Sequence, residues 1–595
     1  MPERNGIFAS TKPAVLSLAA QSTPIVRRPQ SQFEVLVRHL LYRFFHNELL
    51  SSDDETKRVL QVGYFVTLPT LLVSLYLFPV YHAFPPNPYP RPFWPQVSDH
   101  YFFVMYAFIV MGAATVYEWD LLFPDLLDVY VLSVLPIANR RVFFARVLAL
   151  TIFLALVLVG TSLLGTLFLP MVADLPNPGR HFLAHAIAVA CSGTCAAAAV
   201  LAMQGILLNT IGESLFRRIT PLLQGGSVVL LLAILLLFPA VSRSIQPLLT
   251  SGSAAIYYFP PFWFLGVYER ILTGSATLPI FITLSHIACL VVALMLALTV
   301  ITYPLAYRRR VRQIVEGARA AGSPRNLHLP IDAILHSRVI PLPTQRASFY
   351  FVQQTILRLQ RHRVMLAMYA GLGIALALAN MLVFYVTPGH IRPALLPTGI
   401  RAAVPIMAFW TVAGLSSIAS TPIDRRAAWL FRVLVGRPRP GHLSGLRRWI
   451  TLWSLFVTFA TAITLYALSP QSIRSSFSLL TQAVIAIAIS FLLPDIYLFT
   501  TRSMPLTFQR RSNITDLPLM ILRNVVLFPI FVSITVGLGL WMEKNPEHFL
   551  KACVFFATAH VLLLLAHTKY LQQFTVDLAP DDTEEFPQTL GLRDT

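Results

Sequence analysis

The chain contains 595 residues, of which 56% are hydrophobic and only 12% are charged, and its mean hydropathy is +0.65. This composition excludes an ordinary soluble protein, in which about a quarter of the residues are charged. It also excludes a disordered chain, which needs low hydrophobicity. The net charge of +19 suits either nucleic acid or an anionic membrane surface. With so much apolar sequence, we expect membrane lipids and no nucleic acid as partners.

Long apolar segments recur along the chain. Because a membrane-spanning helix needs about 20 mostly apolar residues, the sequence predicts an all-α polytopic membrane protein with about twelve spans. The expected spans are 59–80, 101–117, 142–170, 182–208, 222–241, 280–305, 365–386, 402–419, 450–468, 479–500, 518–541 and 549–570. Arginine clusters fall in alternate loops, so the positive-inside rule predicts that both termini are cytoplasmic.

The spans divide into two six-helix halves, each preceded by a basic amphipathic helix that is expected to lie at the membrane interface. The expected organisation is a disordered cytoplasmic leader (1–32), a first transmembrane half (33–305) with its interfacial helix at 33–50, a basic cytoplasmic connector (306–344), a second half (345–570) with its interfacial helix at 345–363, and an acidic cytoplasmic tail (571–595). In the first interfacial helix the apolar positions are Phe33, Leu36, Val37, Leu40, Leu41 and Phe44. In the second they are Phe349, Phe351, Val352, Ile356 and Leu359.

A short sequence repeat supports this division. The pattern Pro-Ile-x-x-Arg-x5-Arg follows the second span and recurs after the eighth, in the same inner loop of each half. Its first copy is Pro136, Ile137, Arg140 and Arg146, and its second is Pro422, Ile423, Arg426 and Arg432. The arginines are expected to anchor the following helix at the phospholipid headgroups. A positive-inside loop with a chance proline is the plainer alternative.

The segment 117–146 (YEWDLLFPDLLDVYVLSVLPIANRRVFFAR) resembles the first inner loop of bacterial ABC-2-type transporter permeases. In that family the loop runs from acidic residues through an apolar turn and Pro-Ile to a basic start of the third span. Here the matching positions are Asp125, Asp128, Leu132, Pro136, Ile137, Arg140 and Arg146. The interfacial helices resemble the family's elbow helices, and the chain looks like two such permeases fused.

The resemblance implies an exporter subunit of the bacterial inner membrane, whose inner loops dock on a separate ATPase subunit. It implies that Asp125 and Asp128 meet basic residues of the ATPase. The apolar side chains that would fill a groove on the ATPase are Phe123, Leu126, Leu127 and Val131. The second loop, with Pro422, Ile423, Arg426 and Arg432, would serve in the same way.

The chain itself lacks the pattern that ATP hydrolysis needs. A phosphate-binding loop reads Gly-x-x-x-x-Gly-Lys-Ser/Thr, and no Gly-Lys pair occurs in the sequence. We therefore expect no cofactor in this chain, ATP on the partner ATPase, and no enzymatic activity of its own. Two i, i+4 pairs, His181 with His185 and Cys191 with Cys195, share a predicted span. We interpret them as packing residues rather than a metal site, because small residues surround them.

Two features remain open between a structural and a functional role. The intramembrane charges Asp495 and Arg523 form a structural pair, anchor at the interface, or take part in transport. The aromatic outer segment 257–274, in which Pro260 and Pro261 interrupt any continuous helix, is predicted to contain a short interfacial or re-entrant helix. It is either an outer gate, built on Pro260, Pro261, Trp263 and Glu269, or an aromatic membrane anchor.

Two other classes of protein remain as alternatives. An ion-coupled secondary transporter would be expected to carry matched acids at the membrane midplane in both halves, and the sequence shows none. An intramembrane enzyme acting on lipid-linked substrates would need a cluster of acids or ligands. The run from Glu118 to Asp128 is the only candidate for it.

Overall fold

The computed structural model describes residues 31–45, 55–81, 91–119, 121–124, 126–172, 177–211, 213–315, 335–419, 440–468, 476–499, 506 and 516–574. These residues are almost entirely helical, and eleven of the helices are long and apolar enough to cross a membrane. A further helix, α2, contributes a shorter apolar segment at Val66–Tyr81. Each of the twelve expected spans falls on one of these helices, so the prediction of an all-α polytopic membrane protein is confirmed.

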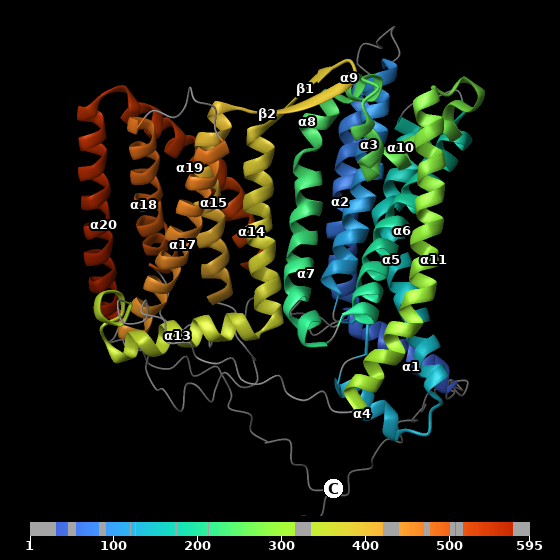
Figure 1. Cartoon of the computed structure of the whole chain (residues 1–595), viewed down its shortest axis with the longest axis horizontal. Coiled ribbons are helices and arrows are strands. Elements are labelled where there is room, and N and C mark those ends of the chain that lie inside the picture. Colours follow the sequence, from blue (N-terminus) through green and yellow to red (C-terminus); the bar gives the residue numbers. More distant parts are fainter. Residues whose placement is uncertain are drawn as a thin grey trace, which may run out of the picture.

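The first half of the chain forms one group of helices, on the right in Figure 1. Its elements are α1 (Gln32–Phe45), α2 (Glu55–Tyr81), α3 (Phe93–Tyr117), α4 (Leu126–Val134), α5 (Asn139–Val172), α6 (Pro178–Thr210), α7 (Glu213–Leu236), α8 (Phe238–Arg243), α9 (Ile245–Thr250), η1 (Ala254–Tyr258), α10 (Pro260–Thr273), η2 (Gly274–Ala276) and α11 (Pro279–Val315). Helices α3 and α6 are the most buried spans of this group and pack against each other and against α5 and α10.

The second half forms the other group, on the left in Figure 1. Its elements are η3 (Leu335–Val339), α13 (Pro343–Arg358), α14 (Gln360–Met381), β1 (Leu382–Thr387), β2 (His390–Leu395), α15 (Pro397–Ala419), α17 (Pro440–Leu468), α18 (Ser476–Leu498), α19 (Asp516–Lys544) and α20 (Pro546–Phe574). Helix α15 is almost wholly buried and contacts α14, α17, α18 and α19, so it forms the centre of this half.

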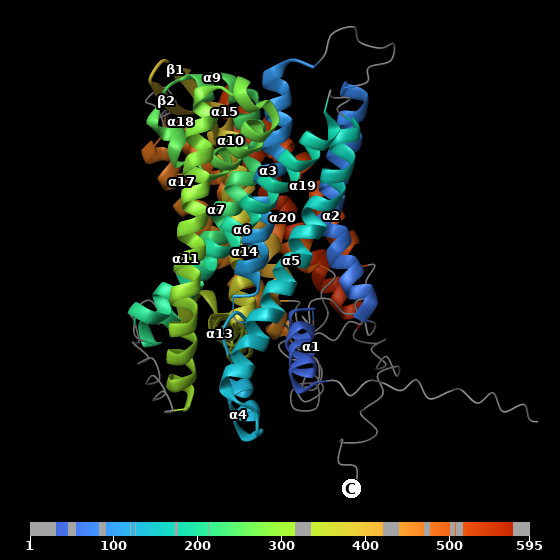
Figure 2. The same ribbon diagram turned by 90° about the vertical axis from the view of Figure 1, so that its right-hand side faces the viewer.

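The helices α1 and α13 lie at one end of the bundle, across the ends of the spanning helices (Figures 1 and 2). We call this end, which also carries α4, the α4 side, and the opposite end, which carries β1, β2, α8 and α9, the hairpin side. The predicted apolar faces are confirmed. Helix α1 buries Leu36, Val37, Leu40 and Phe44 against α5, and α13 buries Phe349, Val352 and Ile356 against its neighbours.

Apolar side chains are also exposed on the outer faces of the bundle. Helix α20 has very few buried residues in its apolar window, and exposed leucines, valines and phenylalanines run along it. Helix α11 has a similar exposed face that includes Leu290, Leu294 and Val300. A water-soluble protein rarely exposes so much contiguous apolar surface, whereas a membrane supplies lipid to cover it.

The two halves meet along α7 and α14, which pack side by side (Figure 1). Small residues keep these two helices close. A Cβ added to Gly225 would lie 3.1 Å from the Cβ of Ala367, and one added to Gly371 would lie 3.2 Å from Val229 Cγ2. This close approach resembles the small-residue contacts that bring membrane helices together without a hydrophobic driving force.

A β-hairpin forms a second junction between the halves, and it was not predicted. The span expected at 365–386 ends as a helix at Met381, because residues 382–386 belong to strand β1. Strand β1 pairs antiparallel with β2 in the register Thr387↔His390, which leaves a two-residue turn. The turn reaches the first half, where the N–H of Gly389 donates to the carbonyl of Ser251 at 2.7 Å.

Several predicted boundaries also shift. Helix α3 begins at Phe93, eight residues before the expected span, and α11 runs through to Val315, ten residues into the expected connector. The remainder of that connector up to residue 334, the predicted leader through residue 30 and the predicted tail beyond residue 574 lie outside the described residues.

Candidate functional site

The loop between α3 and α5 is firmly packed before it forms the short helix α4. Trp119 and Leu122 are fully buried just ahead of it. Gln204 donates from Nε2 to the Trp119 carbonyl at 3.0 Å, and the hydroxyl of Tyr303 donates to the Leu122 carbonyl at 2.6 Å. The backbone that leads into α4 is therefore fixed to α6 and α11.

A carboxylate shared by two arginines fastens α4 itself. Asp128, in the first turn of α4, forms ion pairs with Arg43 of α1 through one oxygen and with Arg146 of α5 through the other. The Arg146 side chain is only 5% exposed, whereas that of Arg43 is 29% exposed. We call these three residues the Asp128 clamp. It ties α4 to an interfacial helix and to a membrane-spanning helix at once.

Beyond the clamp, the described part of α4 and the residue after it expose several apolar side chains. Val131 is 61% exposed, Val134 is 84% exposed, and Leu135 directly after the helix is 45% exposed. We call these three residues the α4 patch. Figure 2 places α4 at the far end of the α4 side, beyond the ends of most spanning helices. An apolar surface that projects there is a typical contact for a protein partner.

The structure separates the predicted coupling residues into several groups. Pro136 and Arg140 are exposed, while Leu132 and Ile137 are half-buried and pack on the core of the first half. Arg146 is buried in the Asp128 clamp. Asp125 lies outside the described residues, as do all four positions of the second loop: Pro422, Ile423, Arg426 and Arg432.

Two expectations for the first loop need correction. The Asp128 carboxylate does not extend freely toward a partner, because both of its oxygens are held by arginines of this chain. Phe123 does not present its ring for a partner's groove, because it is 4% exposed and lies 4.9 Å from the Tyr303 ring. Of the side chains expected to fill a groove on the ATPase, Val131 is exposed, and those of Leu126 and Leu127 lie outside the described residues.

The segment expected to hold a short interfacial or re-entrant helix forms α10 on the hairpin side. Pro260 and Pro261 occupy its first turn, where a missing N–H removes no helical hydrogen bond. Trp263 donates from Nε1 to the Tyr257 carbonyl at 2.7 Å and so closes the turn before the helix. The residues from Phe264 to Glu269 are buried against α3, α6 and α11. Glu269 therefore faces the protein interior rather than an outer surface.

A buried cluster of titratable side chains surrounds Glu269. Its Oε1 lies 2.7 Å from His100 Nδ1 of α3, and both side chains are at most 2% exposed. The His100 ring stacks on Tyr268, with centroids 4.1 Å apart, and lies 5.5 Å from the ring of His181. The hydroxyl of Tyr268 lies 3.5 Å from His185 Nδ1. We call His100, His181, His185, Tyr268 and Glu269 the histidine cluster.

Sequence reasoning found only part of this cluster. It paired His181 with His185 by their spacing and placed Glu269 at a gate, but it missed His100, whose partner is 169 positions away. The available signal was Glu269 itself, a lone carboxylate inside an aromatic segment that needs a partner once buried. Within the described residues, no group of three or more histidines, cysteines or acids is arranged to hold a metal ion.

The second half contains a different acid–histidine pair, toward the α4 side. Asp495 of α18 lies 2.6 Å from His560 Nδ1 of α20 through Oδ2, and 3.5 Å from Arg447 of α17 through Oδ1. Arg523, the other intramembrane charge expected from the sequence, lies in α19, but its side chain is outside the described residues. The two acid–histidine pairs thus lie near opposite ends of the bundle and do not occupy matched positions.

Comparison of the chain with models of known protein families, with curated proteins and with solved structures finds no match.

Proposed function

We propose that the chain is the membrane-spanning subunit of a transporter that is driven by a separate ATPase, in the manner of ABC-2-type permeases. The observation that carries this proposal is the α4 patch, an exposed apolar surface on a helix that the Asp128 clamp fixes to the membrane domain. A docking helix must be accessible to its partner and firmly joined to the part that it moves. Helix α4 has both properties.

In this proposal, the Asp128 clamp transmits a movement of the ATPase from α4 to the membrane-spanning helices. A force on α4 acts on α1 and α5 together, because moving α4 alone would separate a largely buried carboxylate from its two arginines, which is costly. Coupling between two sites requires an element with two states that the partner biases. We assign that role to the unit formed by α1, α4 and α5.

The same proposal assigns the remaining parts of the system. The α4 side faces the cytoplasm of a bacterial cell and the membrane is its inner membrane. The arginine-rich starts of α5 and α17 and the end of α11 lie on this side, which agrees with the positive-inside rule. ATP is bound by the partner, since this sequence has no phosphate-binding loop. Transport is export, with α10 as part of the outer gate.

Co-purification tests the proposal. The tagged full-length chain is isolated in mild detergent from its native membrane, and bound proteins are identified by mass spectrometry together with an ATPase assay. We expect a stoichiometric ATPase partner that carries the phosphate-binding loop. Val134→Asp is expected to reduce its recovery about tenfold or more, because a charge replaces an apolar contact at the centre of the interface.

The control is Leu357→Asp on α13, which changes an equally apolar and 60% exposed residue away from α4. It should leave recovery unchanged, and both variants should unfold at the temperature of the unaltered protein. Purification without any ATPase, or equal recovery with Val134→Asp, contradicts the proposal.

A second candidate is an ion-coupled transporter, which the two acid–histidine pairs favour. Each pair places a histidine, which can bind a proton, beside a carboxylate among the membrane-spanning helices. The pairs are His100 with Glu269 and His560 with Asp495. The test is uptake or release of protons by the purified chain in proteoliposomes under an imposed pH gradient, without ATP or any ATPase. Proton flux that disappears in Glu269→Gln favours this candidate over the ATPase-driven one.

A further inference from the structure

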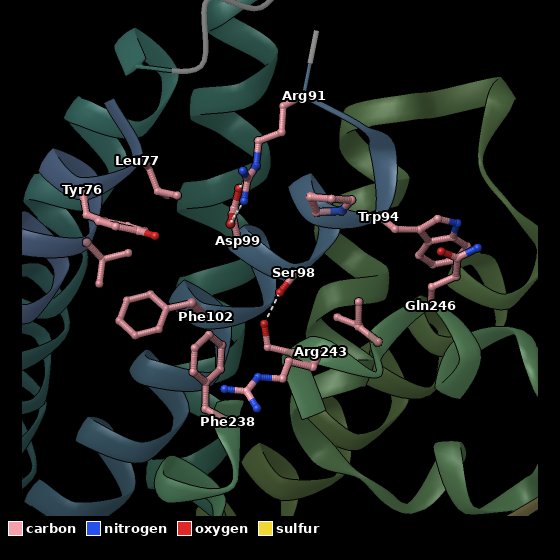
Figure 3. A pocket seen from close by; sticks show the side chains of 14 residues that line it. Tyr76, Leu77, Arg91, Trp94, Ser98, Asp99, Phe102, Phe238, Arg243 and Gln246 are labelled. Carbon is pink, nitrogen blue, oxygen red and sulfur yellow. Dashed lines mark hydrogen bonds and ion pairs between the residues drawn. The ribbon is translucent and has the colours of Figure 1, made fainter. Parts of the chain in front are cut away.

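A cavity of about 550 Å³ lies on the hairpin side of the first half, between α2, the start of α3, and the short helices α8 and α9 (Figure 3). Its volume is in the range of small-molecule sites. One wall is apolar and consists mainly of Leu77, Phe102 and Phe238. The rim carries polar and charged groups, among which Arg91, Asp99 and Arg243 are prominent (Figure 3).

Two of the three charges at the rim neutralise each other. Arg91 binds Asp99 in a bidentate manner, with Nε–Oδ2 and Nη2–Oδ1 distances of 2.7 and 2.8 Å. The hydroxyl of Tyr81 donates to Asp99 Oδ2 at 2.9 Å. This carboxylate is therefore satisfied from two sides, and it is held away from any further cation.

The third charge is uncompensated. Arg243 is exposed at the end of α8, and within the part of the chain that the structure describes it has no hydrogen-bond or ion-pair partner. Its guanidinium extends beside Phe238 at the edge of the cavity (Figure 3). The cavity thus combines an apolar wall with one available positive charge.

Two large aromatic side chains flank the cavity. Tyr76 in its lining is 70% exposed on the outer surface of α2, and Trp94 lines the opposite part of the rim. Tyrosine and tryptophan are characteristic of headgroup depth. A molecule that fills this site would meet the apolar wall on one side and the positive charge of Arg243 on the other.

We propose that this cavity binds an anionic phospholipid from the leaflet on the hairpin side, with its phosphate at Arg243 and the upper part of an acyl chain against Leu77, Phe102 and Phe238. A zwitterionic lipid is a poorer fit, because its cationic group would lie near Arg243, and the Asp99 carboxylate that could offset this repulsion is already bound to Arg91. This proposal goes beyond the proposed function and does not depend on how transport is driven.

Quenching of Trp94 fluorescence by brominated lipid tests it. The full chain is reconstituted into phosphatidylcholine vesicles that contain increasing fractions of phosphatidylglycerol brominated near the headgroup end of its chains. A parallel series uses phosphatidylcholine brominated at the same position. The Trp94 signal is obtained by subtracting the same measurement on the Trp94→Phe version of each variant. We expect half-maximal quenching at about fivefold less brominated phosphatidylglycerol than phosphatidylcholine, which is the effect of one basic residue at the membrane surface.

Three variants and one competitor decide the outcome. Arg243→Ala should abolish the preference for phosphatidylglycerol, and Arg243→Lys should retain most of it. Arg392→Ala, which removes another exposed arginine of the hairpin side on β2, should leave it unchanged. Free glycerol 3-phosphate should not relieve quenching, because it lacks the acyl chain. Equal quenching by both lipids, a preference that survives Arg243→Ala, or full relief by glycerol 3-phosphate overturns the proposal.

Discussion

His100 of α3 and Glu269 of α10 lie 2.7 Å apart in the interior of the first half, with side chains 2% and 1% exposed. This contact joins a membrane-spanning helix to the short helix that begins at Pro260. Because burial of either group alone is unfavourable, the two residues hold α10 in its place.

Glu269→Ala should lower the free energy of unfolding by about 2 kcal/mol or more, because it leaves the buried His100 without its partner. Glu269→Gln should lose less, since the amide still forms a hydrogen bond. Thermal unfolding in detergent measures both. The matched control is Glu547→Ala, which breaks an exposed i, i+4 pair with Lys551 and should change stability by less than about 0.5 kcal/mol. Equal losses at Glu269 and Glu547 would disprove a stabilising role of the buried pair.

The cost of breaking the Asp128 clamp should depend on whether a buried charge is left without its partner. Asp128→Ala should lower the free energy of unfolding by about 3 kcal/mol, because Arg146 is only 5% exposed and loses the carboxylate that it pairs with. Arg43→Ala should cost about 1 kcal/mol, since Arg43 is 29% exposed and Asp128 keeps Arg146. Unfolding of the single and double variants measures the coupling between them. If Arg43→Ala proves as harmful as Asp128→Ala, the ranking is wrong.

Gly266 should be intolerant of a side chain. A Cβ at this position of α10 would lie 2.6 Å from Leu284 Cβ and 2.9 Å from the carbonyl oxygen of Phe281 in α11. Gly266→Ala is therefore expected to cost about 2 kcal/mol by overpacking. Gly226→Ala in α7 meets no atom within 4 Å and should be neutral or slightly stabilising, because alanine favours a helix. Thermal stability compares the two, and a neutral Gly266→Ala would contradict the packing described here.

The hairpin turn should depend on the conformation of Gly389. Its φ of 78° lies in the left-handed region, where alanine costs about 1–2 kcal/mol. Gly389→Ala should therefore speed hydrogen exchange of the backbone amides in β1 and β2, measured by mass spectrometry. Gly179→Ala, at a position with no atom within 4 Å of an added Cβ, serves as the control. Unchanged exchange in the hairpin would show that the turn does not hold it.

The spans and interfacial helices could be predicted because each has a local signature. Leu36, Leu40 and Phe44 share a face by spacing alone, and the structure buries that face. The hairpin was not predicted because Leu382–Thr387 continues an apolar run, which resembles the end of a membrane-spanning helix. A turn signal was present, since the dipeptide Pro388-Gly389 marks a turn or loop within this apolar run.

The candidate sites were harder to predict because they depend on distant partners. The Asp128 side chain was identified, but its pairing with Arg43 spans 85 positions and follows only from the packing of α1 on α5. The cavity on the hairpin side combines residues of α2, α3, α8 and α9, and no single segment carries its pattern. Spacing within one helix reveals a face, whereas a site between helices requires the tertiary arrangement.

The junction between the halves has a mechanical consequence. Along α7 and α14 the contact passes through Gly225, Ala367 and Gly371, which offer no long side chains to interlock. We expect a contact of this kind to let one half rotate against the other with little rearrangement of side chains. At the hairpin side the bond from Gly389 to Ser251 restrains that rotation. The two halves would then rotate about the contact between α7 and α14 while the hairpin holds them together at one end. We therefore expect them to separate further on the α4 side than on the hairpin side.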